Sequence, residues 1–181
     1  MVRAFFFGDM GNEPGVTDET KPEPSARSLR GKRHSKKQGE LAELAFIYKA
    51  ASLGLDVAKP WGDSGRYDFI VDSGTRLWRI QVKSTYNFDG YGYRIGTYWK
   101  STTKHVCYTA EQVDFLAGLV VPEDVWYILP VPAFAPRKAA VVYPHRSTDH
   151  GQYEQYREAW HLLKDDRSAS QTTSDFPLRS K

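Results

Sequence analysis

RYDFIVDSGTRLWRIQVKS, residues 66–84, is the stretch that decides the fold. Two runs rich in β-branched and aromatic residues, 66–72 and 76–84, flank a Ser73-Gly74 pair. Short runs of this kind around Ser-Gly are typical of a β-hairpin with a tight turn. The sequence therefore predicts two antiparallel strands in this stretch.

The register of the hairpin decides which side chains share a face. With a two-residue loop, Asp72 pairs with Thr75, and Asp68 pairs with Arg79. Paired residues point to the same side of a sheet, and so do residues two apart along a strand. The polar side chains then gather on one face, namely Asp68, Arg79, Gln81 and Lys83. The other face is apolar and carries Phe69, Val71, Trp78, Ile80 and Val82. A slip of one residue would separate Asp68 from its partners.

Upstream of the hairpin, residues 38–53 have the pattern of an amphipathic helix. Apolar residues recur at helical spacing and predict its buried face: Leu41, Leu44, Ala45, Tyr48 and Ala51. Gly54 follows as a stop signal. Glu40 and Glu43 are three residues apart and so share a face, from which one of them can bring a further acid to the hairpin.

The polar face of the hairpin combines groups suited to metal-assisted hydrolysis. Asp68 offers a carboxylate oxygen and Gln81 an amide oxygen, with no helpful Cys or His nearby. Oxygen ligands favour Mg²⁺ or Mn²⁺ over Zn²⁺. Lys83 can orient or help deprotonate a water molecule, or stabilise negative charge that grows on a phosphate.

Each of these residues also has a plainer interpretation. Asp68 can be a strand-end acid that pairs with Arg79 or Arg66, and Glu43 can be a solvated helix charge. Asp63 competes with Asp68 as the metal-binding acid, although its Gly-rich surroundings favour a turn.

The composition fits one domain in a reducing compartment. A chain of 181 residues can bury a sizeable core but is too short for two comfortable domains. Its single cysteine, Cys107, excludes an internal disulfide framework. No apolar run is long enough to span a membrane, and the first residues lack the pattern of a signal peptide. We therefore expect a soluble, cytoplasmic protein.

Positive charge is concentrated around the hairpin. Residues 27–105 carry fifteen basic and seven acidic side chains, a net charge of +8, whereas residues 1–26 carry −3 and residues 106–181 carry −2. This distribution is typical of a protein that binds a polyanion. The alternative is a solvated basic surface without a partner.

Residues 86–105 interleave six aromatic side chains with Arg94, Lys100 and Lys104. Aromatic and cationic groups together are typical of nucleic-acid surfaces. The alternative is an edge strand whose aromatic rings pack on the sheet.

The chain divides into three segments. Residues 1–35 are expected to be a disordered N-terminal segment that ends in a basic arm, and residues 36–145 the main domain. Residues 146–181 are expected to hold a helix over 153–163 and a disordered tail. Within the main domain, residues 108–113 suggest a short helical or turn element, and further strands are expected at 55–58, within 91–98, at 114–121 and at 125–129.

The order of helix, hairpin and later strands resembles the PD-(D/E)XK nuclease superfamily. Three segments between residues 36 and 130 carry the resemblance: Gly39-Glu40-Leu41-Ala42-Glu43, Arg66-Tyr67-Asp68 and Gln81-Val82-Lys83. More narrowly, the chain is similar to the branch of group I intron-encoded homing endonucleases and their bacterial relatives, in which Gln replaces the second acid. The resemblance implies an α/β fold with a restriction-endonuclease-like αβββαβ core, a mixed central sheet flanked by helices, and metal-dependent hydrolysis of DNA.

The resemblance also assigns roles by position. Asp68 matches the metal-binding acid, Gln81 the second ligand position and Lys83 the catalytic lysine. Glu43 matches the helix acid, with Glu40 as the competing choice. Gln81 removes one negative charge from the family pattern, which weakens the expected metal affinity.

We therefore expect an endonuclease that uses Mg²⁺, or Mn²⁺, to cut double-stranded DNA. Glu43, Asp68 and Gln81 would hold the metal, and Lys83 would serve the attacking water. The residues expected to bind nucleic acid are Arg66, Arg94, Lys100 and Lys104. Cutting both strands needs two active sites, so we expect a homo-oligomer on DNA. One alternative is a catalytically inactive DNA-binding protein that retains the fold, and another is an RNA-directed or repair nuclease with the same site.

Overall fold

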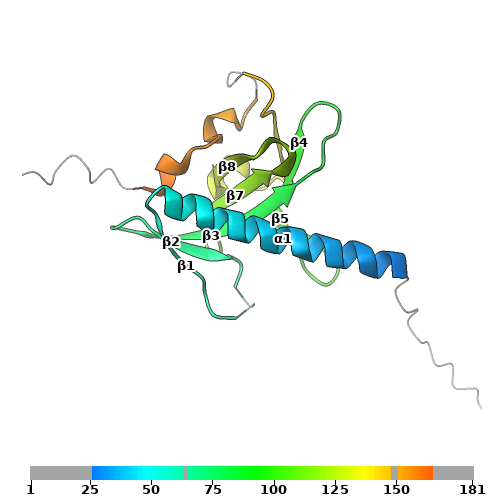
Figure 1. Cartoon of the computed structure of the whole chain (residues 1–181), viewed down its shortest axis with the longest axis horizontal. Helices are drawn as coiled ribbons and strands as arrows, with labels where there is room; N and C mark the ends of the chain where they lie inside the picture. Colours follow the sequence, from blue (N-terminus) through cyan, green and yellow to red (C-terminus); the bar gives the residue numbers. More distant parts are fainter. Residues whose placement is uncertain (1–25, 63–64, 148–150, 165–181) are drawn as a thin grey trace, which may run out of the picture.

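A computed structural model describes residues 26–62, 65–147 and 151–164, with side chains from residue 35 onward. The long helix α1 (Ala26–Ser52) lies across one face of a five-stranded sheet (Figure 1). The strand order is β1-β2-β3-β7-β8, in which β3 and β7 are parallel and the other neighbours antiparallel. The strands are β1 (Asp56–Ala58), β2 (Phe69–Asp72), β3 (Leu77–Thr85), β7 (Phe115–Val120) and β8 (Val125–Pro130). The expected mixed α/β sheet is confirmed.

The second face of the sheet is covered by a two-stranded ribbon instead of a long helix. It pairs β4 (Tyr93–Gly96) with β9 (Ala139–Val142), and the short helix α2 (Val131–Phe134) contributes to the same core. The ribbon approaches β7 closely at Gly118, where an added Cβ would lie 2.7 Å from a methyl carbon of Ile95. A side chain at position 118 would force the buried Ile95 to move, so glycine allows β4 to pack closely on β7.

The strand expected within residues 91–98 is therefore real but lies outside the central sheet. Its continuation, β5 (Tyr98–Lys100), pairs with β6 (His105–Cys107) in a second small hairpin. Residues 108–113 form a turn that leads into β7, and the 3-10 helix η1 (Val121–Glu123) joins β7 to β8.

The hairpin of β2 and β3 is present, but the expected register was wrong by two residues. Asp72 pairs with Leu77 instead of Thr75, so the loop holds residues 73–76. Side chains hold this wider turn: the Asp72 carboxylate accepts the Gly74 N–H at 2.7 Å, and the Ser73 hydroxyl accepts the Arg76 N–H at 3.1 Å. A shift of two residues keeps every side chain on its expected face.

Helix α1 corrects two expectations. It begins at Ala26, so its backbone includes the end of the segment expected to be disordered up to residue 35, while residues 1–25 lie outside the described residues. The expected buried face was wrong: Leu41, Leu44 and Tyr48 are 55%, 61% and 79% exposed. The side chains buried against the sheet are Ala42, Phe46 and Ala50.

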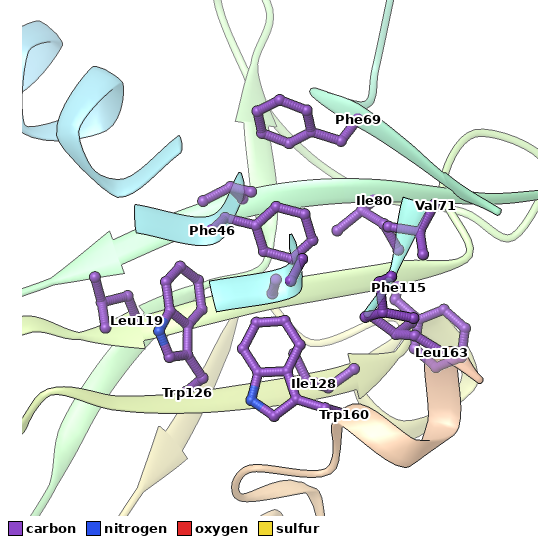
Figure 2. Packing of buried hydrophobic residues seen from close by; sticks show 14 of the residues in the cluster. Phe46, Phe69, Val71, Ile80, Phe115, Leu119, Trp126, Ile128, Trp160 and Leu163 are labelled. Atoms are coloured by element: carbon purple, nitrogen blue, oxygen red, sulfur yellow. The ribbon is translucent and has the colours of Figure 1, made fainter. Parts of the chain in front are cut away.

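The burial of this second stripe has a physical reason. Ala42, Phe46 and Ala50 also repeat at helical spacing, and the two alanines let α1 approach the sheet closely around one large ring. Figure 2 shows Phe46 among aromatic side chains from the sheet and the C-terminal segment. Its ring centroid lies 5.3 Å from that of Phe69 and 5.7 Å from that of Trp160.

The structured part continues beyond the expected boundary at residue 145. In place of the helix expected over 153–163, two 3-10 helices form, η2 (Glu154–Tyr156) and η3 (Trp160–Leu163). Glu158 separates them with a left-handed backbone, and its carboxylate accepts the Trp126 N–H at 2.7 Å and the Trp160 indole N–H at 2.8 Å. Trp160 and Leu163 complete the core beneath α1 (Figure 2). The disordered tail expected from Arg167 lies outside the described residues.

Candidate active site

Glu43, Asp68, Gln81 and Lys83 line one cavity of about 400 Å³. Glu43 comes from α1, Asp68 from the residue before β2, and the other two from β3. The cavity lies where the helix passes the hairpin, so packing of α1 on the sheet sets the distance between the helix acid and the strand residues. The fold thus brings together all four residues that the sequence singled out.

Asp68 is held by hydrogen bonds from β3. Its Oδ2 atom accepts the backbone N–H of Val82 at 2.8 Å and a side-chain N–H of Gln81 at 2.5 Å. The same Gln81 amide nitrogen donates to the Val82 carbonyl oxygen at 3.2 Å. The neutral NH₂ group of Gln81 thus bridges two oxygen acceptors.

The structure separates the two candidate helix acids. Glu43 lines the cavity, and together with Asp68 it also lines a smaller neighbouring pocket of about 180 Å³. Its carboxylate pairs with the Lys59 ammonium group at 2.8 Å. The Glu40 side chain is 59% exposed and lies 3.9 Å from Lys36. Asp63, the competing strand acid, lies outside the described residues.

Burial shifts the proton affinities of Asp68 and Lys83 in opposite directions. Burial raises the pKa of Asp68 above its usual range and the Glu43 charge adds to this, while the Val82 hydrogen bond and the Lys83 charge oppose it. Burial lowers the pKa of Lys83, with Asp68 and Glu43 opposing the shift. Each group therefore has its charged form destabilised by loss of water, which is common in catalytic sites.

The arginines suspected of pairing with Asp68 have other partners. The Arg79 guanidinium makes two hydrogen bonds to the Asp114 carboxylate, at 3.0 and 2.9 Å, and ties β3 to the start of β7. The Arg66 guanidinium carbon lies 3.5 Å from the centroid of the Trp99 indole. These contacts occupy both arginines, and the Asp68 carboxylate lines the cavity.

Two residues near the site were not anticipated. Tyr108 is buried, and the Lys83 ammonium nitrogen lies 5.6 Å from the centroid of its ring. Burial and the nearby Asp68 raise the pKa of the Tyr108 phenol, which therefore stays neutral. Lys59 neutralises Glu43. Neither residue belongs to a periodic pattern or a motif in the sequence, so only the fold reveals them.

The remaining basic residues expected to bind nucleic acid differ in their surroundings. Lys100 lines a cavity that also includes Lys83. Arg94 is paired with Asp89 at 3.2 Å in the loop before β4. Lys104 is exposed in the turn between β5 and β6 and does not line these cavities.

Comparison with known proteins agrees with this geometry. The sequence profile of the PD-(D/E)XK endonuclease family matches residues 33–163. The chain belongs to the PD-(D/E)XK endonuclease family. Among solved structures, this PD-(D/E)XK chain is similar to the bacterial homing endonuclease I-Ssp6803I, with 27% sequence identity and a TM-score of 0.65. The match covers 77% of this chain and 99% of that one. No curated protein matches the sequence.

The donor set of this PD-(D/E)XK site fits a divalent cation. PD-(D/E)XK nucleases generally use divalent metal ions. In the described part of the chain, no group of three His, Cys, Asp or Glu side chains is placed to hold a metal. The cavity offers two carboxylates, Glu43 and Asp68, and the Gln81 amide. Mg²⁺ is commonly held by one or two carboxylates with water completing its shell. Glu43, Asp68 and Gln81 meet that requirement.

Proposed function

We propose that this protein is a metal-dependent endonuclease that hydrolyses phosphodiester bonds of double-stranded DNA. The observation that carries the proposal is the single cavity that unites Glu43, Asp68, Gln81 and Lys83. The family supplies the reaction class, and the similar homing endonuclease supports DNA as the substrate. The net charge of +8 over residues 27–105 supports a polyanionic substrate as well.

Each residue of the cavity has a role that follows from its chemistry. Asp68 and Glu43 would hold Mg²⁺ or Mn²⁺ through carboxylate oxygens, and Gln81 would offer its amide oxygen as a further ligand. When bound, the metal would supply Lewis-acid chemistry and would lower the pKa of a water molecule that it holds. Lys83 orients the attacking water and stabilises negative charge on the phosphate. Tyr108 packs against Lys83 and limits the positions that its ammonium group can take.

Surrounding groups serve the substrate. Lys100 lines the cavity next to the site and Arg66 covers the Trp99 ring in its wall, so these two would contact the cut strand, while Arg94 and Lys104 would contact DNA further away. Double-strand cleavage requires two copies of the site, which we propose come from a homo-oligomer on DNA. The single cysteine suits a cytoplasmic enzyme. No helix in the described residues is long and apolar enough to span a membrane.

Nicking of supercoiled plasmid DNA in the presence of Mg²⁺ tests the proposal. Asp68→Ala and Lys83→Ala are each expected to lower the nicking rate by about a hundredfold or more, because each removes a group aimed at the reacting phosphate. Asp56→Ala and Lys138→Ala are matched controls, since both side chains are exposed and outside the cavity. Equal nicking by all five proteins, the wild type included, would remove Asp68 and Lys83 from the mechanism.

A second candidate function is DNA binding without catalysis. It is favoured by Gln81, which replaces an acid and turns its amide nitrogen towards Asp68. This alternative predicts salt-sensitive binding to DNA and no nicking with either Mg²⁺ or Mn²⁺. Metal-dependent nicking that Lys83→Ala abolishes would exclude it.

A further inference from the structure

A second cavity adjoins the catalytic cavity at Lys83. The two share Lys83 and Ser84 on β3 and Ser35 on α1, so these residues form the join between them. The second cavity has a volume of about 500 Å³, within the range of small-molecule sites. Its far wall is built by β4 and β5, through Gly96, Tyr98, Trp99 and Lys100.

The two cavities together form a groove, and its two ends differ in their charged side chains. The catalytic end carries the carboxylates of Glu43 and Asp68. The second cavity is lined by no acidic side chain and by two lysines, Lys83 and Lys100. Within the described residues, Lys100 has no carboxylate within 4.0 Å. One end of the groove therefore suits a cation and the other suits an anion.

The wall beside Lys100 consists of fixed aromatic rings. The Tyr98 ring is stacked on His105, with ring centroids 4.2 Å apart and ring planes at 23° to each other. The Trp99 ring is covered by the Arg66 guanidinium. At Gly96, an added Cβ would contact the Tyr98 ring at 3.4 Å, so the absent side chain leaves space next to that ring. Such flat, immobilised surfaces suit a sugar or base.

We propose that the second cavity binds the nucleotide directly next to the scissile phosphodiester on the cut strand. Lys100 binds the phosphate of that nucleotide, and Tyr98 supports its sugar or base. Lys83, at the join, then lies between two successive phosphates of one strand. This assignment rests on the proposed endonuclease function and adds to it a direction in which the cut strand leaves the catalytic cavity.

A charge-deletion experiment on both partners tests this assignment. First, a position cut by the wild type is mapped. Two duplexes are then made, each with one uncharged methylphosphonate, which lies on one side of that position in the first duplex and on the other side in the second. For each duplex, kcat/KM of nicking is measured with the wild type, Lys100→Ala and Lys138→Ala. Lys138 is the matched control, because its side chain is exposed and does not line the cavity.

The wild type is expected to lose about tenfold or more in kcat/KM when the phosphate on one side is neutral, as for loss of a charge-assisted hydrogen bond. Lys138→Ala should show the same ratio, whereas for Lys100→Ala the two duplexes should be cut equally well. Lys100→Arg, which keeps the charge, should restore the wild-type ratio. If the wild type ignores both neutral phosphates, or if Lys100→Ala keeps the wild-type ratio, the assignment is wrong while the endonuclease function stands. If the wild type nicks no duplex, the proposed function itself fails.

Discussion

The orientation of α1 decides whether Glu43 belongs to the site, and core substitutions can measure it. Phe46 is fully buried and stacks on Phe69, whereas Leu44 on the same helix is 61% exposed. Phe46→Ala removes a ring that packs between the helix and the sheet, which costs about 4 kcal/mol of folding free energy. In a domain of this size that corresponds to a decrease in Tm of roughly 8–16 °C. Leu44→Ala should change the free energy of unfolding by no more than about 0.5 kcal/mol.

Urea unfolding followed by tryptophan fluorescence measures both values. The comparison is demanding because the hydrophobic pattern of the sequence favours Leu44 as the buried residue. If Leu44→Ala destabilises the protein as much as Phe46→Ala, α1 is rotated from the position described above. Glu43 would then not face the hairpin, and its role as helix acid would be refuted.

Three further predictions concern Gln81 in the cavity, the buried pair of Glu154 and Tyr127, and the ion pair of Arg79 and Asp114. Gln81→Glu adds a carboxylate to the cavity, so Mg²⁺ should bind at least about tenfold more tightly in isothermal titration calorimetry, and unchanged affinity would argue against position 81 as a ligand. Glu154 is buried, and its carboxylate accepts the Tyr127 hydroxyl at 2.7 Å; Glu154→Gln should lower the free energy of unfolding by about 2 kcal/mol, and Tyr127→Phe by about 1 kcal/mol, in urea titrations. Burial raises the pKa of Asp114, but hydrogen bonds from Arg79 outweigh this and hold it below its usual range. Its stabilising effect is therefore complete at neutral pH and is lost as the pH falls through the lowered pKa, so the stability difference between the wild type and Asp114→Asn should shrink below about pH 4; a constant difference would contradict this.

The alternating pattern of the hairpin was enough to predict that Asp68, Gln81 and Lys83 lie together. Side-chain direction repeats every two residues, so the error of two residues in register left Asp68, Gln81 and Lys83 in place. The register itself was not predictable from the Ser73-Gly74 pair. It depends on hydrogen bonds that the Asp72 carboxylate and the Ser73 hydroxyl make inside the turn.

The face of α1 could not be predicted because the helix carries two apolar stripes. Leu41, Leu44 and Tyr48 are the more hydrophobic set, yet the sheet accepts the set that centres on Phe46. What decides is the fit of one ring among Phe69, Trp126 and Trp160, which come from distant parts of the sequence. Helical periodicity contains no information about those partners.

The prediction of a helix over residues 153–163 was wrong for a related reason. The weak helical spacing of this segment was correct in placing Trp160 and Leu163 on the core. However, Glu158 interrupts the helical backbone between η2 and η3. Its carboxylate accepts hydrogen bonds from the Trp126 N–H on β8 and the Trp160 indole N–H on η3. That hydrogen-bond network is a tertiary feature, so local sequence patterns do not show it.

The most direct test of the metal-dependent site is the nicking rate of supercoiled plasmid DNA as a function of Mg²⁺ concentration, for the wild type and Asp68→Ala in parallel. The wild type should be inactive in EDTA, and its rate should rise with Mg²⁺ to a plateau. Asp68→Ala should stay inactive across the same range, because it lacks the carboxylate that Val82 and Gln81 hold in the cavity. Nicking by the wild type without metal, or the same Mg²⁺ curve for both proteins, would contradict the proposed site.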